Sequence, residues 1–272
     1  MKDRRSITAI WAVGAWAVAL LFFFPVLWMV LTGFKKESDA ATNPPTWIFS
    51  PTLEGYRQVF GRNITPYLLN SLMAAVFSTI LVLLLAIPAA YALSLRPVAK
   101  WQDALFFFIS TKMLPAVAAL LPIYLVVKSL GMLDNIWTLV ILYTSINLPL
   151  AVWMMRSFLL EVPREVLEAG EVDGASLLTS IRRIIMPIVS PGLAATGLIC
   201  FIFAWNEFFL AVNLTATNAG TAPIFLVGFI SSEGLFLARL CAAATLVSLP
   251  VLIAGWLAQN KLVRGLSMGA VK

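Results

Sequence analysis

Long apolar stretches dominate this chain of 272 residues and limit what it can fold into more than any other feature. Several of them exceed the roughly 18–20 residues that a helix needs to cross the hydrocarbon core of a bilayer. The chain is 61% hydrophobic and only 12% charged, about half the charged fraction of a typical soluble domain. Inside a bilayer every backbone polar group must find a partner within the protein. We therefore expect an all-α membrane protein with about six transmembrane helices.

Charged and proline-rich segments separate the apolar stretches and set the expected positions of the spans. The run from Trp11 to Leu31 is too long for the apolar part of a signal peptide, and no small-residue cleavage site follows it. We interpret it as an uncleaved first span, and residues 1–272 as a single transmembrane domain. The expected spans are residues 9–32, 67–94, 104–127, 136–156, 189–212 and 237–258.

Lysine and arginine are distributed unevenly between the two sides of this arrangement. If the N-terminus lies inside, the basic residues at both ends of the chain and in the loops near residues 96–100, 156–164 and 182–183 all lie inside. Few basic residues then lie outside. Because cytoplasmic segments carry such an excess, we expect both termini to be cytoplasmic. The net charge of +6 comes from these scattered residues and does not indicate nucleic-acid binding.

The composition also excludes several kinds of site. The chain has no histidine, which excludes histidine-ligated metals and a Ser-His-Asp group. Cys200 and Cys241 both lie inside apolar stretches, where they are expected to act as small packing residues. We expect no metal site and no catalytic residue. An intramembrane enzyme would need carboxylates at membrane depth, and these are sparse in this chain.

A polar loop at about residues 158–188 interrupts the apolar pattern between the fourth and fifth expected spans. Pro163 suits the first turn of a helix. Arg164 and Glu168 have the spacing of a helical ion pair. Gly174 can end this helix because glycine adopts the left-handed conformation without steric cost. The local sequence therefore predicts a first short helix that ends at Gly174.

A second short helix is expected directly after Gly174. Ser176 can cap it, residues 177–185 can form it, and Pro187 is expected to end it. The small residues Ala169 and Gly170 would allow a partner to approach closely. An ordinary amphipathic loop is equally compatible with this geometry, so the pattern alone does not assign a role.

The spacing of this loop resembles the EAA loop found in permease subunits of binding-protein-dependent ABC importers. That motif is glutamate, two alanines, three variable residues, glycine, nine variable residues, then isoleucine, one variable residue, leucine and proline. Here Gly170 replaces the second alanine, which loosens the helix by up to about 1 kcal/mol, and Met186 replaces the leucine at similar volume. The residues that the resemblance assigns to coupling with an ATPase are Glu168, Ala169, Gly170, Asp173, Gly174, Ile184 and Pro187.

Two further segments are similar to the smaller permease subunit of maltose-type sugar transporters. Residues 203–208, FAWNEF, resemble a signature of the fifth span, and residues 265–272, GLSMGAVK, resemble the end of such chains. The resemblance covers essentially the whole chain. It implies a multi-pass protein of the bacterial plasma (inner) membrane that imports a sugar or polyol. Polyols of the sorbitol or mannitol type are expected first, and glycosylated sugars next.

The resemblance also implies partners. These are a second permease subunit in a heterodimer, two copies of an ATPase subunit, an extracytoplasmic solute-binding protein and membrane lipid. In such permeases the EAA loop fits a cleft on the ATPase, and the tail can reach the ATPase pair. This chain lacks the G-x-x-x-x-G-K-[ST] phosphate loop. We therefore expect no cofactor on this chain, with ATP and Mg²⁺ on the separate ATPase.

Three ionisable or amide side chains fall inside expected spans, namely Lys112 in the third and Asn206 and Glu207 in the fifth. Such groups are costly at membrane depth and usually face a bundle interior or an aqueous cavity. One interpretation is a substrate path, because amide and carboxylate groups can bind sugar hydroxyls. The alternative is structural, with these side chains pairing between helices or extending to the interface.

Asn70, Ser71 and Asn147 are also polar residues at or near spans. We expect each of them to cap a helix or to bond between helices. A secondary transporter driven by an ion gradient is the main alternative function. Such proteins often contain repeated halves and buried charge networks, and this sequence shows neither clearly.

Overall fold

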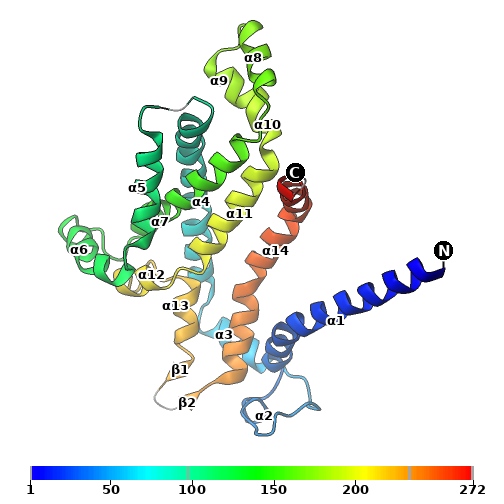
Figure 1. Ribbon diagram of the computed structural model, residues 1–272. Helices are drawn as coiled ribbons and strands as arrows, with labels where there is room; N and C mark the ends of the chain where they lie inside the picture. Colours follow the sequence, from blue (N-terminus) through cyan, green and yellow to red (C-terminus); the bar gives the residue numbers. More distant parts are fainter. Residues whose placement is uncertain (1, 97, 232–233, 271–272) are drawn as a thin grey trace. The chain divides into compact units, whose positions relative to one another are not determined.

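The structure is a computed structural model that describes residues 2–96, 98–231 and 234–270, with side chains for residues 11–96, 98–230 and 236–259. The chain divides into two compact units, each described here by itself. The first comprises residues Met1–Thr65 and Phe225–Leu249, and the second comprises residues Pro66–Ile224 and Pro250–Lys272. Within the described ranges the regular elements are helices, apart from one pair of two-residue strands (Figure 1).

Helices of membrane-spanning length confirm the expected class. Four single helices are long and apolar enough to cross a membrane, and two further spans are possible if each of two bent helix pairs counts as one. The expectation of an all-α membrane protein with about six spans is therefore confirmed, but two of the spans are broken. The four single helices are Trp11–Gly33, Thr65–Ser94, Ile136–Leu159 and Leu237–Gln259.

The first unit combines the N-terminal part of the chain with residues Phe225–Leu249. Its members are α1 (Lys2–Gly33), α2 (Glu37–Ala40), α3 (Glu54–Gly61), β1 (Ile230–Ser231), β2 (Gly234–Leu235) and the first part of α14 (Leu237–Ala270). The two strands pair antiparallel, with Ile230 opposite Leu235. Gly33 allows α1 to touch α14, because a β-carbon there would lie 3.1 Å from the backbone of Ala242.

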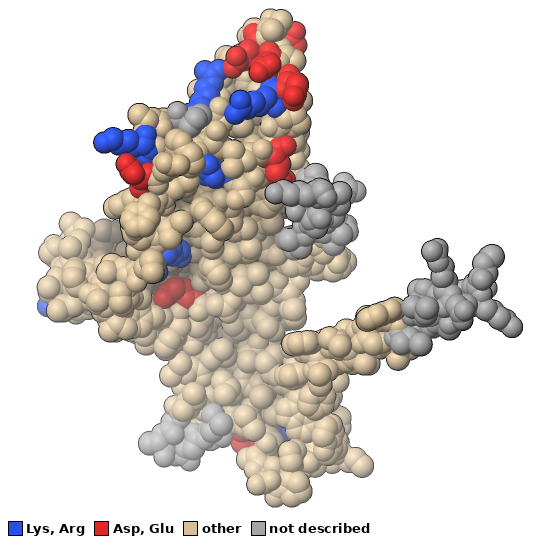
Figure 2. Space-filling view, in the orientation of Figure 1, with Lys and Arg blue, Asp and Glu red and all other residues tan. Residues whose placement is uncertain are grey.

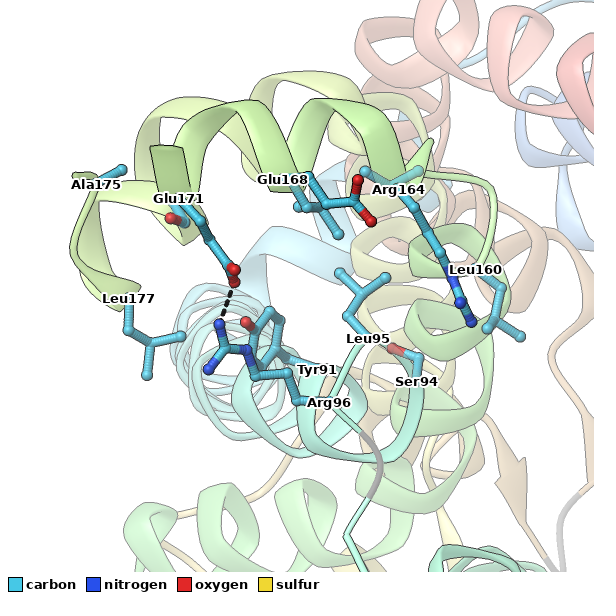
Figure 3. A pocket seen from close by; sticks show the side chains of 13 residues that line it. Tyr91, Ser94, Leu95, Arg96, Leu160, Arg164, Glu168, Glu171, Ala175 and Leu177 are labelled. Atoms are coloured by element: carbon cyan, nitrogen blue, oxygen red, sulfur yellow. Dashed lines mark hydrogen bonds and ion pairs between the residues drawn. The ribbon is translucent and has the colours of Figure 1, made fainter. Parts of the chain in front are cut away.

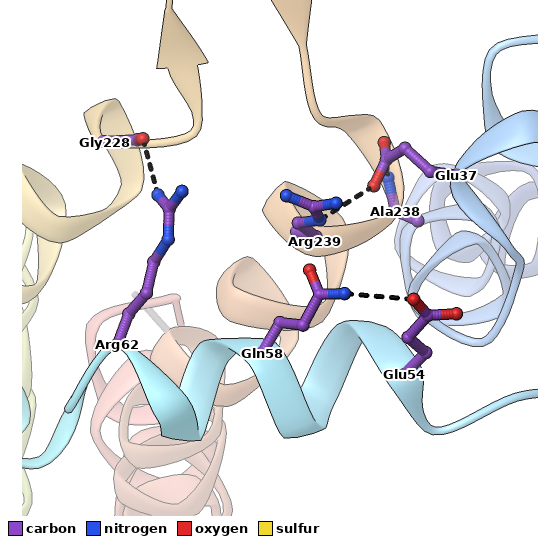
Figure 4. Close-up of polar contacts among 7 residues, drawn as sticks. All are labelled: Glu37, Glu54, Gln58, Arg62, Gly228, Ala238 and Arg239. Atoms are coloured by element: carbon purple, nitrogen blue, oxygen red, sulfur yellow. Dashed lines mark hydrogen bonds and ion pairs between the residues drawn. The ribbon is translucent and has the colours of Figure 1, made fainter.

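Polar side chains hold the connections of the first unit (Figure 4). Glu37 accepts a hydrogen bond of 2.9 Å from the backbone N–H of Ala238 at the start of α14, and it pairs with Arg239 at 3.5 Å. A carboxylate suits this position because a helix N-terminus carries a partial positive charge. Arg62, just after α3, donates to the carbonyl of Gly228 at 3.0 Å. Glu37 thus ties α2 to the start of α14, and Arg62 ties the end of α3 to residue 228.

Three long helices form the core of the second unit: α4 (Thr65–Ser94), α7 (Ile136–Leu159) and α11 (Ser190–Trp205). Lipid is as apolar as a core side chain, so close packing rather than water exclusion stabilises such contacts. Small side chains allow this close packing. Ala86 and Ala90 of α4, Ala151 of α7 and Cys200 of α11 are all fully buried in one cluster. Cys200 is therefore the packing residue that was expected.

The third expected span, residues 104–127, is not one continuous helix. It is divided into α5 (Trp101–Met113) and α6 (Ala116–Ser129), whose axes differ by 92°. Pro115 has an extended backbone, with φ −60° and ψ 122°, and it has no N–H to continue the hydrogen-bond ladder of α5. The third expected span is therefore present as a bent pair of helices, and Lys112 lies in the last turn before the break.

The fifth expected span, residues 189–212, is also interrupted. It consists of α11, which ends at Trp205, and the short helix α12 (Phe209–Leu214), followed by α13 (Ala222–Val227). Asn206 is the C-cap of α11, so the two predicted polar residues lie in the connection rather than within a helix. Polar side chains can satisfy the backbone groups that such a break leaves without helical partners.

Asp134, in the turn between α6 and α7, anchors the segment that follows α12. Its carboxylate accepts backbone hydrogen bonds of 2.9–3.1 Å from residues 216–219. Burial would raise the pKa of Asp134, but the hydrogen bonds from Ala216, Ala219, Asn218 and Thr217 outweigh it and hold the pKa at about 2. The Asp134 carboxylate therefore holds the segment after α12 against the turn between α6 and α7.

The same segment is also bonded to α4. Asn70 donates to the carbonyls of Asn218 and Gly220 at 2.8 and 3.0 Å, and Ser71 accepts from the N–H of Ala222 at 2.8 Å. Both residues therefore bond between α4 and another segment, in line with the role expected for them.

Candidate functional site

The polar loop between α7 and α11 begins with α8 (Arg164–Val172), as the sequence predicts. Pro163 is the N-cap residue, and Glu165 lies in the first turn. Gly174 has a φ of +72°, the left-handed conformation that glycine adopts at a helix end. The N–H of Ala175 then bonds back to the carbonyl of Gly170 at 2.9 Å. Local signals therefore determine the first helix of the loop.

The second part of the loop is helical but not uniformly α-helical. It runs through α9 (Leu177–Thr179), a π-helix η1 (Ser180–Ile185) and α10 (Met186–Ile188). The hydroxyl of Ser176 caps α9 by accepting from the N–H of Thr179 at 3.4 Å, as expected. Pro187 does not end the helix, which continues to Ile188. The missing N–H of Pro187 disturbs the preceding ladder, and the wider π-turn lies directly before it.

Gly170 lies where the two halves of the loop touch. It is buried, and a β-carbon built on it would lie only 2.5 Å from Cδ1 of Ile184. From the sequence, Gly170 is expected to let a partner approach and to loosen the helix. In the structure Ile184 of the same loop occupies that space, so the glycine allows the two halves to pack together.

The other predicted coupling residues lie on the outside of the loop. Glu168, Ala169, Asp173 and Pro187 are exposed. Apolar side chains are exposed on the same loop as well, and Val172, Leu177 and Leu178 are the most exposed of them. In Figure 2 charged side chains gather over α8 and α9 and at the nearby end of α5, whereas the middle of the face shown is mostly uncharged. The loop thus presents a mixed polar and apolar surface of the kind that binds another protein.

A pocket of about 570 Å³ lies between the loop and the end of α4 (Figure 3). Arg96, just beyond α4, forms an ion pair with Glu171 on α8. This hydrogen-bonded contact raises the pKa of Arg96. The ion pair expected between Arg164 and Glu168 is absent among the described side chains, and the acidic residue of α8 that forms an ion pair is Glu171, with a partner from a distant part of the sequence. Sequence spacing along one helix gives no signal for such a pair.

A second cavity, of about 280 Å³, brings the predicted substrate-path residues together. Its lining comprises Lys112 from the end of α5, Tyr143, Ile146 and Asn147 from α7, and Phe203, Ala204, Asn206 and Glu207 from α11 and its end. The breaks in the third and fifth spans both open onto it. The grouping of Lys112, Asn206 and Glu207 was not predictable from their separation in the sequence.

Glu207 and Asn206 are largely engaged by backbone groups. The carboxylate of Glu207 accepts from the N–H groups of Leu210 and Ala211 at 2.9 and 3.2 Å, and so caps α12. Asn206 donates to the carbonyl of Ile202 at 2.8 Å, which leaves its amide oxygen available. Lys112 makes no hydrogen bond or ion pair within the described part of the chain. The structural interpretation therefore applies to the Glu207 carboxylate, whereas Lys112 is unpaired.

Sequence reasoning missed Asn147 as a cavity residue. It was expected to cap a helix or to bond between helices, yet its side chain makes neither contact among the described residues, although only 3% of the residue is exposed. A polar residue one turn after Tyr143 in an apolar helix was the available signal. Residues 265–272, which resemble a family ending, lie outside the part of the chain whose side chains are described.

Residues 82–263 match the model of a family described as "Binding-protein-dependent transport system inner membrane component". A probable ABC transporter permease protein of Sinorhizobium fredii is 37% identical over 271 residues, which covers 99% of this chain and 98% of that protein. The trehalose transport system permease protein SugB of Mycobacterium tuberculosis is 30% identical over 279 residues and covers all of both chains.

A solved structure has the same fold. It is a chain from the crystal structure of a bacterial ABC transporter that imports the acidic polysaccharide alginate. It matches with a TM-score of 0.75 at 21% identity and covers 96% of this chain and 98% of its own length.

Members of the matched family are permease subunits of ABC importers, which work with a separate ATPase and a solute-binding protein. They are not enzymes, and nothing in the comparisons supports the ion-coupled alternative. The chain therefore belongs to the binding-protein-dependent transport system inner membrane components and is a multi-pass permease subunit of an ABC transporter.

Proposed function

We propose that this permease imports a carbohydrate and forms half of the translocation pathway together with a second permease subunit. The full-length likeness to a trehalose permease carries the proposal. A cavity at the broken spans, lined by amide and charged groups, supports it because sugars are bound through many hydroxyl contacts. Lys112, Asn206 and Glu207 are the proposed path residues, with Glu207 acting partly as the cap that positions α12.

The second permease subunit is proposed to cover an apolar hollow in the second unit. This hollow, of about 510 Å³, is lined by Ile109, Pro149, Leu150, Trp153 and Phe203, and it shares Lys112 and Phe203 with the path cavity. Trp153 and Phe203 are both more than half exposed. Covering this face with a related subunit would enclose the cavity between two chains and so create a continuous path.

The loop at residues 158–188 is proposed to couple this path to the ATPase, in an assembly with two ATPase copies. Glu168, Ala169, Asp173, Gly174 and Pro187 form the exposed part, and Gly170 and Ile184 hold its two halves together. ATP and Mg²⁺ are assigned to the ATPase alone. With both termini in the cytoplasm, residues 33–66 and 214–236 face outward and receive the solute-binding protein.

The proposed function is tested by calorimetry on the solute-binding protein of the same transporter. The panel comprises trehalose, maltose, sorbitol, mannitol and two amino acids. Uptake of each bound compound is then measured in vesicles that contain the complete complex. We expect a saccharide or polyol to bind and to be taken up in an ATP-dependent manner. Binding and uptake of an amino acid, with no carbohydrate bound, would overturn the proposal.

A further inference from the structure

An unpartnered amide lies in the wall of the path cavity. Asn147 is 3% exposed, yet its side chain has no hydrogen-bond partner among the described residues, and it lines the cavity of about 280 Å³. The amide atoms of Asn147 are not among the fully buried side-chain atoms that lack a partner, so they reach the open space of the cavity. A polar group in such a place takes water or a ligand as its partner, because leaving it unpaired costs about 1–3 kcal/mol. The Asn147 amide is therefore available to a ligand in the cavity.

The surroundings of Asn147 suit one sugar ring. Tyr143 lies one turn earlier on the same face of α7, Phe203 supplies an aromatic ring, and Asn206, whose amide oxygen accepts no hydrogen bond among the described residues, also lines the cavity. A volume of about 280 Å³ is at the lower limit of the roughly 300–1,000 Å³ typical of small-molecule sites. The cavity thus has room for a single ring or a short polyol rather than a long saccharide.

The charges of the cavity indicate a neutral ligand. Among the described residues that line it, the charged ones are Lys112 and Glu207, and their formal charges cancel. The carboxylate of Glu207 is already bonded to two backbone N–H groups. An anionic sugar such as a uronate would leave one negative charge in excess, which is costly at membrane depth.

We propose that this cavity is a subsite for a neutral sugar ring or polyol, in which the Asn147 amide binds two neighbouring hydroxyl groups. The amide offers both a donor and an acceptor, so one hydroxyl can donate to its oxygen while the next accepts from its nitrogen. Lys112 and the Asn206 oxygen bind further hydroxyls. The inference rests on the carbohydrate permease function proposed above and assigns a substrate contact to this chain.

The test uses the complete transporter complex in lipid nanodiscs, without the binding protein, and saturation-transfer NMR with trehalose, sorbitol and galacturonate as probes. The same complex is studied for uptake in vesicles with saturating binding protein. We expect a saturation-transfer signal for trehalose or sorbitol and no such signal for galacturonate. In Asn147→Leu, which keeps the branched shape of the side chain but removes its polar atoms, we expect the saturation transfer to disappear and the uptake rate to fall about tenfold.

Stability separates a ligand contact from a structural one. Because the amide has no partner, Asn147→Leu should leave the yield and thermal midpoint of the complex unchanged or raise them. Asn213→Ala is the matched control, since Asn213 is an exposed amide that donates to Phe209 of its own helix at 2.6 Å. This control should bind and transport like the wild type, and Asn147→Ala should repeat the loss of binding.

Three outcomes would overturn the inference. Wild-type binding and uptake in both Asn147 variants would remove Asn147 from the subsite. A lower thermal midpoint and yield in Asn147→Leu, with uptake per assembled complex unchanged, would show a structural role. If instead the wild-type complex takes up no carbohydrate at all, the proposed function itself fails and the subsite falls with it.

Discussion

Ile184 packs directly over Gly170, so that a single added carbon on Gly170 would lie 2.5 Å from Cδ1 of Ile184. This contact joins α8 to the π-helical half of the proposed coupling loop. Any movement of α8 away from the π-helical half would break this contact and expose Ile184 and Gly170 to solvent. The pair therefore makes the two halves behave as one body.

Replacing Gly170 by a larger residue should weaken the coupling of ATP hydrolysis to uptake, and more so for a larger side chain. Gly170→Val should displace Ile184 and destabilise the loop by about 1–3 kcal/mol, whereas Gly170→Ala should have a smaller effect because the end of the Ile184 side chain can move. The measurement is uptake per ATP hydrolysed in assembled complexes. In the double variant Gly170→Ala and Ile184→Val, the shorter valine leaves room for the added methyl group. Uptake per ATP hydrolysed should therefore return to the wild-type value. Normal coupling in Gly170→Val would contradict this packing argument.

Gly174, in the proposed coupling loop, and Gly131, outside it, both have a left-handed backbone, so the same substitution can be compared at the two positions. Their φ angles are +72° and +66°, and nothing lies near a β-carbon at either position. An alanine should cost about 1 kcal/mol at each because of the left-handed conformation. We expect Gly174→Ala to lower uptake per ATP, and Gly131→Ala to lower only the thermal midpoint. Equal effects of both variants on the uptake ratio would remove the special role of Gly174.

The clamp at Asp134 should make the second unit sensitive to acid. The folded pKa of about 2 lies below the ordinary value, so the carboxylate stabilises the fold above pH 4, and this contribution is lost as the pH falls from about 4 to 2. After allowance for solvent screening, it amounts to about 1 kcal/mol. Asp134→Asn should lower the thermal midpoint at pH 7 and flatten its fall below pH 4.

The matched control for Asp134→Asn is Asp103→Asn, since Asp103 is exposed and its carboxylate accepts no hydrogen bond within the described part of the chain. This variant should keep the wild-type midpoint and its pH profile. A profile for Asp134→Asn that parallels the wild type down to pH 2 would show that the carboxylate does not provide the acid-sensitive contribution.

The proposed orientation can be tested with two strongly exposed positions. Ile48 is 93% exposed in the segment proposed to face outward, and Val172 is 88% exposed in the proposed coupling loop. In a background with Cys200 and Cys241 replaced by alanine, Ile48→Cys should react with a membrane-impermeant maleimide in intact cells. Val172→Cys should react only after the membrane is opened. The reverse pattern would place the termini outside.

Local signals predicted the proposed coupling loop better than the membrane helices. Gly174 and Ser176 act on their own neighbours, so the ends of α8 and α9 could be placed from the sequence. The partner of Glu171 could not, because Arg96 comes from another helix end. The Arg164–Glu168 prediction failed because it considered only one helix.

Proline gave an ambiguous signal within the spans. Pro115 accompanies a 92° break, yet Pro25, Pro88, Pro149 and Pro250 all lie inside continuous helices. Neighbouring groups can satisfy the backbone around a proline in a membrane helix, and a sequence does not show which prolines have such neighbours. For the same reason the role of Glu207 as a cap of α12 appeared only in the structure.

The π-helix at Ser180–Ile185 makes the orientation of α8 depend on the number of residues in the loop. A π-turn is equivalent to an α-helix that has received one extra residue. Deleting one residue there would regularise the helix and rotate the preceding chain by about 100° around its axis. Such a deletion would change none of the remaining side chains, but it would turn α8 to another direction. The number of residues between Gly174 and Ile184 therefore determines the direction in which α8 points.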